Sequence, residues 1–164
     1  MRVREFVGGD LGAVVELSLR AWEPVFASSA EVMGGEIYRR EYPDWRVSQR
    51  GAVEEVCTGG KAEVWVAEDE AAGGVVGFVA VVLEGEEEAG KRAGAVEMLA
   101  VDPELQGRGV GTLLTGFATE WMRGRGVTLA SIWTGGDPGH AAARRTYEKA
   151  GHTALPLVRY YKAL

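Results

Sequence analysis

Apolar residues recur along the chain at two spacings, which together predict a mixture of strands and helices. Alternating or valine-rich runs indicate strands, and apolar residues three and four positions apart indicate amphipathic helices. In chain order the predicted elements are a strand at 2–6, helices at 11–22 and 45–57, strands at 62–67, 75–83 and 95–101, a helix at 110–121, a strand at 127–133, a helix at 141–150 and a final strand around 158–161. This order predicts one mixed α/β domain over residues 1–164, in which an antiparallel hairpin precedes a parallel strand–helix–strand unit.

The segments between these elements are predicted from residues that cap or interrupt regular structure. Asp10 and Asp44 are candidate N-caps for the first two helices, and Pro24 is expected to end or kink the first. Residues 25–43 are expected to form a loop with a short helix, and residues 84–94 a charged loop.

Composition and charge narrow the class of protein. The 164 residues are 46% hydrophobic and 26% charged, which is typical of a soluble globular domain. A net charge of −6 without a basic block argues against nucleic acid as a partner and suits a cationic substrate better. The single Cys57, the absence of an apolar leader and the absence of an 18-residue apolar run predict a cytoplasmic protein that does not enter membranes.

A glycine-rich loop at residues 106–111 lies between a predicted buried strand and a helix. Free backbone N–H groups and the positive end of the helix dipole make such a loop suitable for binding phosphate. The glycines fit neither the G-x-G-x-x-G pattern of dinucleotide-binding proteins nor the Walker A pattern, which excludes those two ligand classes. On the loop alone, a tight turn that lets the helix pack closely remains the alternative.

Two motifs resemble those of the GCN5-related N-acetyltransferases (GNAT). Residues 106–111 match the family's pyrophosphate-loop pattern of Gln or Arg, two residues, Gly, one residue, and Gly or Ala. Residues 140–152 resemble its second signature, usually Asn, then Ala three residues on, Tyr seven residues on, and Glu-Lys-x-Gly-Phe. Ala143, Tyr147, Glu148, Lys149 and Gly151 fit this signature, whereas His140 replaces the usual Asn and His152 the usual Phe.

The resemblance implies a GNAT fold and acetyl-CoA-dependent transfer to an amine. The expected fold has a mixed, mostly antiparallel central sheet with a splayed parallel strand pair and helices on both faces. The expected reaction is direct attack of a primary amine, on a small molecule or an exposed amino group, in a ternary complex without a metal. A homodimer is an expectation from the same resemblance, and a non-catalytic CoA-binding or sensor module is the alternative function.

Site residues carry over from the motifs. Tyr147 is the expected general acid that protonates or stabilises the leaving thiolate. Glu97, a carboxylate within the apolar strand at 95–101, is the candidate general base. The residues expected to bind the cofactor are Met98, Leu99, Val101, Gln106, Gly107, Arg108, Gly109, Val110, Gly111, His140, Ala143 and Tyr147. The aromatic side chains that could wall an acceptor pocket, or equally belong to the core, are Trp22, Phe26, Tyr38 and Trp45. For Trp22, which lies on the apolar stripe of its helix, the core is the expected place.

Overall fold

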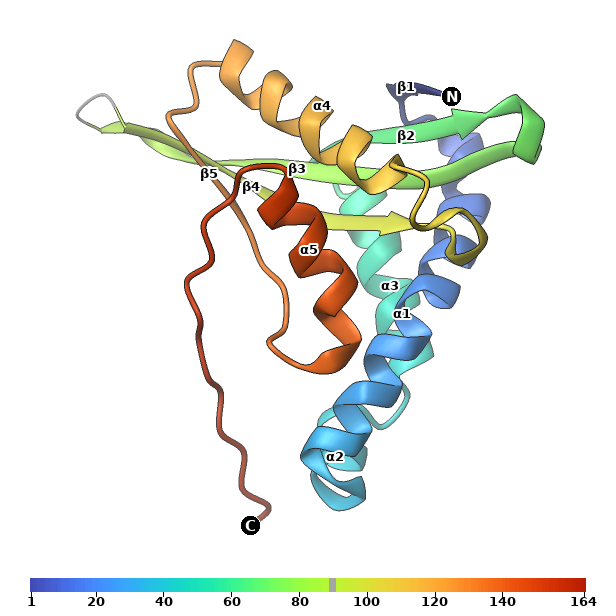
Figure 1. The fold of residues 1–164 in the computed structure, drawn as a ribbon, viewed down its shortest axis with the longest axis vertical. Helices are drawn as coiled ribbons and strands as arrows, with labels where there is room; N and C mark the ends of the chain where they lie inside the picture. The colour runs from blue at the N-terminus through green and yellow to red at the C-terminus, as the bar shows by residue number, and fades with distance from the viewer. Residues whose placement is uncertain (89–90) are drawn as a thin grey trace.

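The structure is a computed structural model that describes residues 1–88 and 91–164 (Figure 1). Its strands are β1 (Arg2–Glu5), β2 (Glu63–Asp69), β3 (Gly74–Glu88), β4 (Lys91–Val101) and β5 (Leu129–Ile132). Its helices are α1 (Leu11–Met33), α2 (Gly35–Glu41), α3 (Trp45–Thr58), α4 (Val110–Gly124) and α5 (Ala141–Lys149). Short 3₁₀ turns include η1 (Gly8–Asp10), η2 (Glu70–Ala72), η3 (Pro103–Leu105) and η4 (Pro138–His140).

The five strands form one sheet in the order of the chain, β1-β2-β3-β4-β5. The first four strands are antiparallel to their neighbours, and β4 and β5 run parallel, as the crossover through α4 requires. The mixed, mostly antiparallel sheet expected from the sequence is therefore confirmed.

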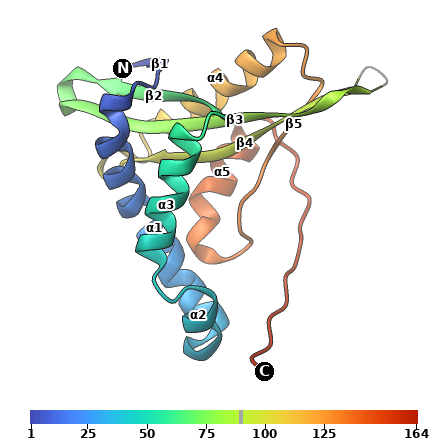
Figure 2. The same ribbon diagram turned by 180° about the vertical axis from the view of Figure 1, so that it is seen from behind.

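Helices cover both faces of this sheet (Figures 1 and 2), and the buried apolar side chains form a separate core on each face. Phe78 of β3, fully buried, packs with the apolar residues of α1 and α3 on one face. Leu114 of α4, also fully buried, packs with the other set of strand side chains on the opposite face. Successive residues of β3 alternate between the two cores, which is why the strand reads as a continuous apolar run in the sequence.

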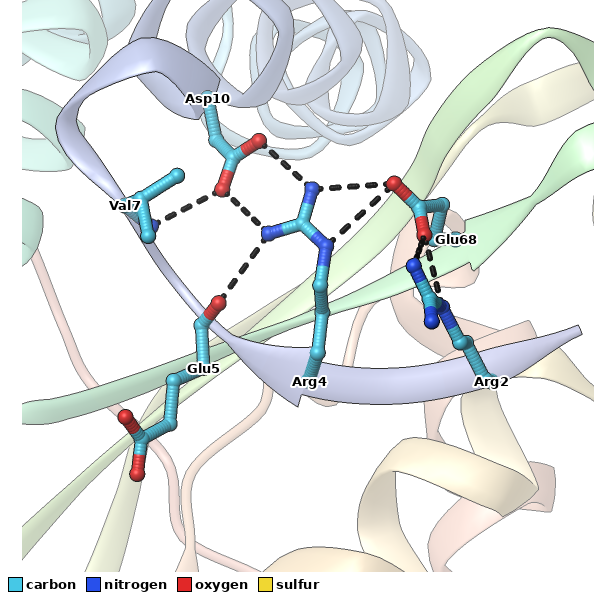
Figure 3. Close-up of polar contacts among 6 residues, drawn as sticks. All are labelled: Arg2, Arg4, Glu5, Val7, Asp10 and Glu68. Carbon is cyan, nitrogen blue, oxygen red and sulfur yellow. Dashed lines mark hydrogen bonds and ion pairs between the residues drawn. The ribbon is translucent and has the colours of Figure 1, made fainter.

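An ionic cluster holds β1 against β2 and the start of α1 (Figure 3). The Arg4 guanidinium donates to both oxygens of Asp10, at 2.7 and 2.9 Å, and also contacts Glu68 of β2. Asp10 Oδ2 accepts a further hydrogen bond from the Val7 N–H at 2.9 Å. Asp10 lies at the N-cap position of α1 as predicted, but its side chain does not cap the helix. The carboxylate binds Arg4 and Val7 and accepts no hydrogen bond from the first turn of α1.

The largest error in the sequence prediction concerns residues 25–43. The first helix does not end at Pro24 but continues to Met33, and α2 follows after Gly34, so this segment is mostly helical. A proline inside a helix removes its own N–H bond and crowds the carbonyl four residues earlier, but α1 continues through Pro24, which lies at an exposed position. By contrast, Asp44 caps α3 as predicted, with its Oδ1 accepting the Val47 N–H at 3.2 Å.

Two strand predictions also need correction. The charged loop predicted at residues 84–94 is largely strand, because β3 extends to Glu88 and β4 begins at Lys91; residues 89–90 lie outside the described part of the chain. The final strand predicted at 158–161 is not formed. Residues 152–164, the C-terminal segment, run away from the sheet toward α2 (Figure 1), and a strand cannot form without a partner to complete its hydrogen bonds.

Candidate active site

The parallel pair separates partway along β4. Cα pairing between β4 and β5 runs from Ala93 and Leu129 to Val96 and Ile132, and β4 then continues alone on that side to Val101. The backbone groups of β4 that face this side beyond Val96 are therefore available to a ligand. The splayed pair expected from the sequence is confirmed.

A β-bulge lies at the same point on the other side of β4. Val96 pairs with Val81 and Met98 with Ala80, so Glu97 is an extra residue without a partner on β3. Bulges bend a strand and redirect side chains, and they are frequent beside active sites. Glu97 is exposed, in contrast to its buried neighbour Val96.

A cavity of about 290 Å³ occupies the space between the separating strands. Its walls come from β4, the glycine loop, the end of β5, the middle of α1, and α5 with the turn before it. The site residues that line it are Glu97, Met98, Leu99, Val101, Gln106, Gly107, Gly111, His140, Ala143 and Tyr147. These come from both sequence motifs and from the strand between them, so the fold gathers most of the predicted site around one opening.

The glycine loop presents the start of α4 to one end of this cavity. Gly107 and Gly109 have φ angles of 76° and 87°, a left-handed conformation that favours glycine, and Gly109 is the residue from which the helix starts. The Leu113 N–H bonds the Gly109 carbonyl at 2.9 Å, so the N–H groups of the three preceding helical residues have no partner within the helix. Such amides attract an anion.

The remaining residues of the loop have different surroundings. Gln106 donates to the Val101 carbonyl at 3.3 Å, which ties the loop to the end of β4. Arg108 is exposed and does not line the cavity, and the side chain of Val110 is buried in the α4 core. A Cβ at Gly111 would lie 3.3 Å from Thr146 Cγ2, so this glycine allows α4 and α5 to pack closely.

Tyr147 reaches the cavity from α5 and is 9% exposed. Burial raises the pKa of its phenol to about 12, so the hydroxyl stays protonated at neutral pH. The residue is therefore a hydrogen-bond donor in a largely apolar wall.

His140 lies at the start of α5 and also lines the cavity. Its Nδ1 bonds Asp137 Oδ1, and Asp137 Oδ2 accepts the Ser28 hydroxyl at 2.7 Å and the Gly139 N–H at 3.0 Å. Burial opposes ionisation of Asp137, but the hydrogen bonds from Ser28 and His140 outweigh it and hold the pKa of this carboxyl below its usual value. Sequence reasoning missed Asp137 and Ser28, although the Asp-Pro-Gly spacing indicates a capped turn.

The structure separates the four aromatic residues that were assigned either to an acceptor pocket or to the core. Trp22 lines the cavity, but Phe26, Tyr38 and Trp45 do not. Phe26 instead stacks on Trp45, with ring centroids 4.4 Å apart, where α1 meets α3. Trp133, directly after β5, is the aromatic wall residue that the sequence prediction missed, and it is 75% exposed.

The fold and the site match the architecture expected of the GNAT class, in which a mixed sheet opens between its parallel strands beside a glycine-rich helix start. The chain belongs to the Acetyltransferase (GNAT) family, whose profile matches residues 32–152. Among curated relatives, it is 38% identical over 68 residues to a mycothiol acetyltransferase of Beutenbergia cavernae, and 40% over 62 residues to one of Sanguibacter keddieii. These matches cover 42% and 38% of the chain but only 22% and 19% of the relatives.

Solved structures agree with the fold over the whole chain. A mutant of the BH1408 protein from Bacillus halodurans matches with a TM-score of 0.75, 17% identity and full coverage of both chains. An aminoglycoside 6'-N-acetyltransferase from Acinetobacter haemolyticus matches with a TM-score of 0.67 and 16% identity, covering all of this chain and 99% of that one. Within the described residues, no helix combines the length and apolar character needed to cross a bilayer.

Proposed function

We propose that this protein is an acetyl-CoA-dependent N-acetyltransferase that acetylates a primary amine by direct attack in a ternary complex. The observation that carries the proposal is a cavity that joins the unpaired end of β4, the amide-rich start of α4 and Tyr147. One opening thus holds an extended backbone surface, an anion site and a proton donor.

The residues present fit the expected cofactor. The amides from Gly107 to Gly111 suit a pyrophosphate, and the free side of β4 from Met98 to Val101 suits the amide groups of a pantetheine arm. Ala143, a small residue, leaves room on the α5 side. We assign Arg108 and Val110 contacts through their backbone only, because neither side chain lines the cavity.

When bound, acetyl-CoA would supply a thioester whose carbonyl carbon an amine can attack. The N–H of Leu99, on the stretch of β4 that has no partner on β5, would donate to the developing oxyanion. Tyr147 would donate a hydrogen bond to the leaving sulfur. Cys57, on α3, does not line the cavity, and burial raises the pKa of its thiol to about 11, which supports direct transfer over an acyl-cysteine route.

The acceptor side of the cavity favours a cationic small molecule. Among the described residues that line the cavity, Glu97 has the one acidic side chain, and none of the others is Lys or Arg. The Glu97 carboxylate would attract the ammonium form of an amine. Trp22 and Trp133 offer aromatic faces that suit a cation or a sugar ring. The similar proteins include mycothiol and aminoglycoside acetyltransferases, which supports a small-molecule acceptor.

Two measurements test this function. Acetyl-CoA should raise the melting temperature of the purified protein, and a panel of polyamines, aminoglycosides and amino sugars should include at least one amine that releases free thiol. Coenzyme A lacking the acetyl group is the control ligand. Binding without turnover across the panel would support the alternative, a CoA-binding sensor, for which His140 in place of Asn is the supporting feature.

Location and assembly remain expectations. The cytoplasmic location is proposed from the single cysteine and the composition, and the homodimer from the family resemblance. The exposed apolar side chains of the C-terminal segment, with Leu155 and Tyr160 at 80% and 89% exposed, favour self-association. Light scattering on a sizing column would report a mass of one or two chains.

A further inference from the structure

His140 and Asp137 form a hydrogen-bonded pair at the cavity wall that the reaction above does not use. Because the Asp137 carboxyl is ionised, it can only accept hydrogen bonds, so His140 Nδ1 must carry the proton in this contact. In the neutral ring, Nε2 then keeps its lone pair. No described residue bonds Nε2, and the imidazole lines the cavity.

The carboxylate that orients His140 is itself held from two elements. Asp137 Oδ2 accepts from the Gly139 N–H within the turn and from Ser28 on α1, while Oδ1 is left for the imidazole. Arg144 donates to the Asp137 carbonyl at 2.8 Å and fixes the backbone of the same loop. A capped turn needs only one carboxylate oxygen, which here is Oδ2. Capping therefore does not account for the hydrogen bond between Oδ1 and His140.

The loop is also shaped around this pair. A Cβ at Gly135 would overlap both Asp137 Oδ1 and His140 Nδ1, the two atoms of the hydrogen bond. A Cβ at Gly139 would lie 2.6 Å from the Ser28 Cβ. Neither glycine has a positive φ, so close packing around the Ser28–Asp137–His140 group explains them better than backbone strain does.

We propose that His140 is the general base of the acetyl transfer and that Asp137 is its positioning residue, a proposal that rests on the function proposed above. The bound ammonium first gives one proton to water, which frees the lone pair of its nitrogen. As the bond forms between this nitrogen and the acetyl carbon, His140 Nε2 takes the second proton that the nitrogen loses. The carbon–sulfur bond breaks with its electron pair on sulfur, and the thiolate takes a proton from water. His140 returns its proton to water, so the products are the acetamide and the free thiol.

Geometry favours His140 over Glu97 for this step. Glu97 is exposed on a bulge, and no hydrogen bond of the described structure holds its carboxylate. His140 is fixed by Asp137, and imidazole takes and releases protons near neutral pH, which suits a general base at that pH. Glu97 is then left to attract the ammonium form of the acceptor.

The test compares His140→Asn, which keeps a hydrogen-bonding side chain but no basic nitrogen, with Asp137→Asn. His140→Asn should lower kcat by roughly 100-fold or more, since positioned bases contribute about that much, and leave the Kd for CoA within threefold. Asp137→Asn should lower kcat by at least about tenfold through misorientation of the ring. His152→Asn, which changes the only other histidine, is the matched control and should keep full activity.

A spectroscopic measurement separates the base from a merely structural histidine. In a His152→Asn protein without an affinity tag, ¹⁵N-histidine labelling reports one imidazole, which should be the Nδ1–H form when neutral and lose that preference on Asp137→Asn. Full kcat in His140→Asn, or an Nε2–H imidazole, would overturn this proposal while leaving the acetyltransferase function standing. A wild-type protein that acetylates no amine would overturn both.

Discussion

Replacing Tyr147 with Phe removes one hydroxyl and keeps the ring that packs between α5 and the cavity. No described residue forms a hydrogen bond with the Tyr147 hydroxyl. Every fully buried polar side-chain atom of the described residues has a hydrogen-bond partner, so the hydroxyl oxygen is not fully buried, and it faces the cavity that Tyr147 lines. We therefore expect the free energy of unfolding to change by less than about 0.5 kcal/mol, the range of substitutions that break no contact.

The expected loss of rate follows from the pKa of this phenol, which burial raises to about 12. A thiol ordinarily titrates near ~8.5, so complete proton transfer from Tyr147 to a thiolate is uphill by roughly 3.5 pKa units, or about 5 kcal/mol. The phenol should act by hydrogen bonding instead. A hydrogen bond to a charged partner contributes about 1.5–3 kcal/mol, which corresponds to a roughly 10- to 150-fold fall in kcat.

The assay is thiol release at saturating acetyl-CoA, combined with calorimetric CoA binding and thermal unfolding of both proteins. Tyr147→Phe should lower kcat within that range while the Kd for CoA changes less than threefold. The wild-type rate should also show no alkaline decline from Tyr147 below about pH 11, because the phenol ionises near 12. An unchanged kcat would show that the hydroxyl does not contact the sulfur, and a loss beyond about 10⁴-fold would show that the phenol transfers its proton fully.

Three further substitutions test the acceptor site and the fold. Glu97→Gln should raise KM for a cationic amine about five- to tenfold with kcat within threefold, whereas a large loss of kcat would make Glu97 the base. Arg4→Met should lower the free energy of unfolding at pH 7 by about 1.5–3 kcal/mol through its contact with Asp10, as measured by urea denaturation. Hydrogen bonds from Arg4 lower the pKa of Asp10 in the folded protein. The stabilisation is therefore fully present above the ordinary carboxyl pKa and is lost as the pH falls through the lowered pKa of Asp10. In Arg4→Met, the free energy of unfolding should fall less steeply over this acidic range. Phe78→Ala should cost about 3–5 kcal/mol, and a smaller loss would mean that the core between β3 and α1 collapses around the gap.

Local patterns in the sequence were sufficient to predict the glycine loop and the strand and helix on either side of it. The strand, loop and helix from Ala95 to Gly124 are consecutive, so their residues meet through short-range geometry that spacing can predict. The second motif needed the resemblance to a family, since nothing local says that α5 lies beside the loop. Both motifs lie at one cavity in the structure, but the roles of their residues remain predictions.

Tertiary packing decided the parts that the sequence could not predict. Whether a helix continues past Pro24 depends on what lies beyond it, and here the continuation brings Ser28 of α1 against the turn that holds Asp137. That contact joins residues 109 positions apart, so no periodicity reveals it. The strand prediction for the C-terminal segment was wrong because a tertiary contact is missing. Residues 158–161 have the composition of a strand, but strand formation depends on a neighbouring sheet edge that this segment does not reach.

The opening of the sheet depends on backbone geometry at one position of β4. On its β3 side, Glu97 is an unpaired extra residue, and on its β5 side Val96 is the last residue with a partner. A bulge increases local twist and bends its strand, so the bend at Glu97 explains why β5 cannot follow β4 any further. Because pairing, rather than particular side chains, creates the cavity, the same architecture persists in a structure that shares only 17% of its residues with this chain. The side chains around the opening, including His140, Asp137 and Trp133, are then free to differ between proteins that share this fold, and they are where the choice of acceptor and of base must be sought.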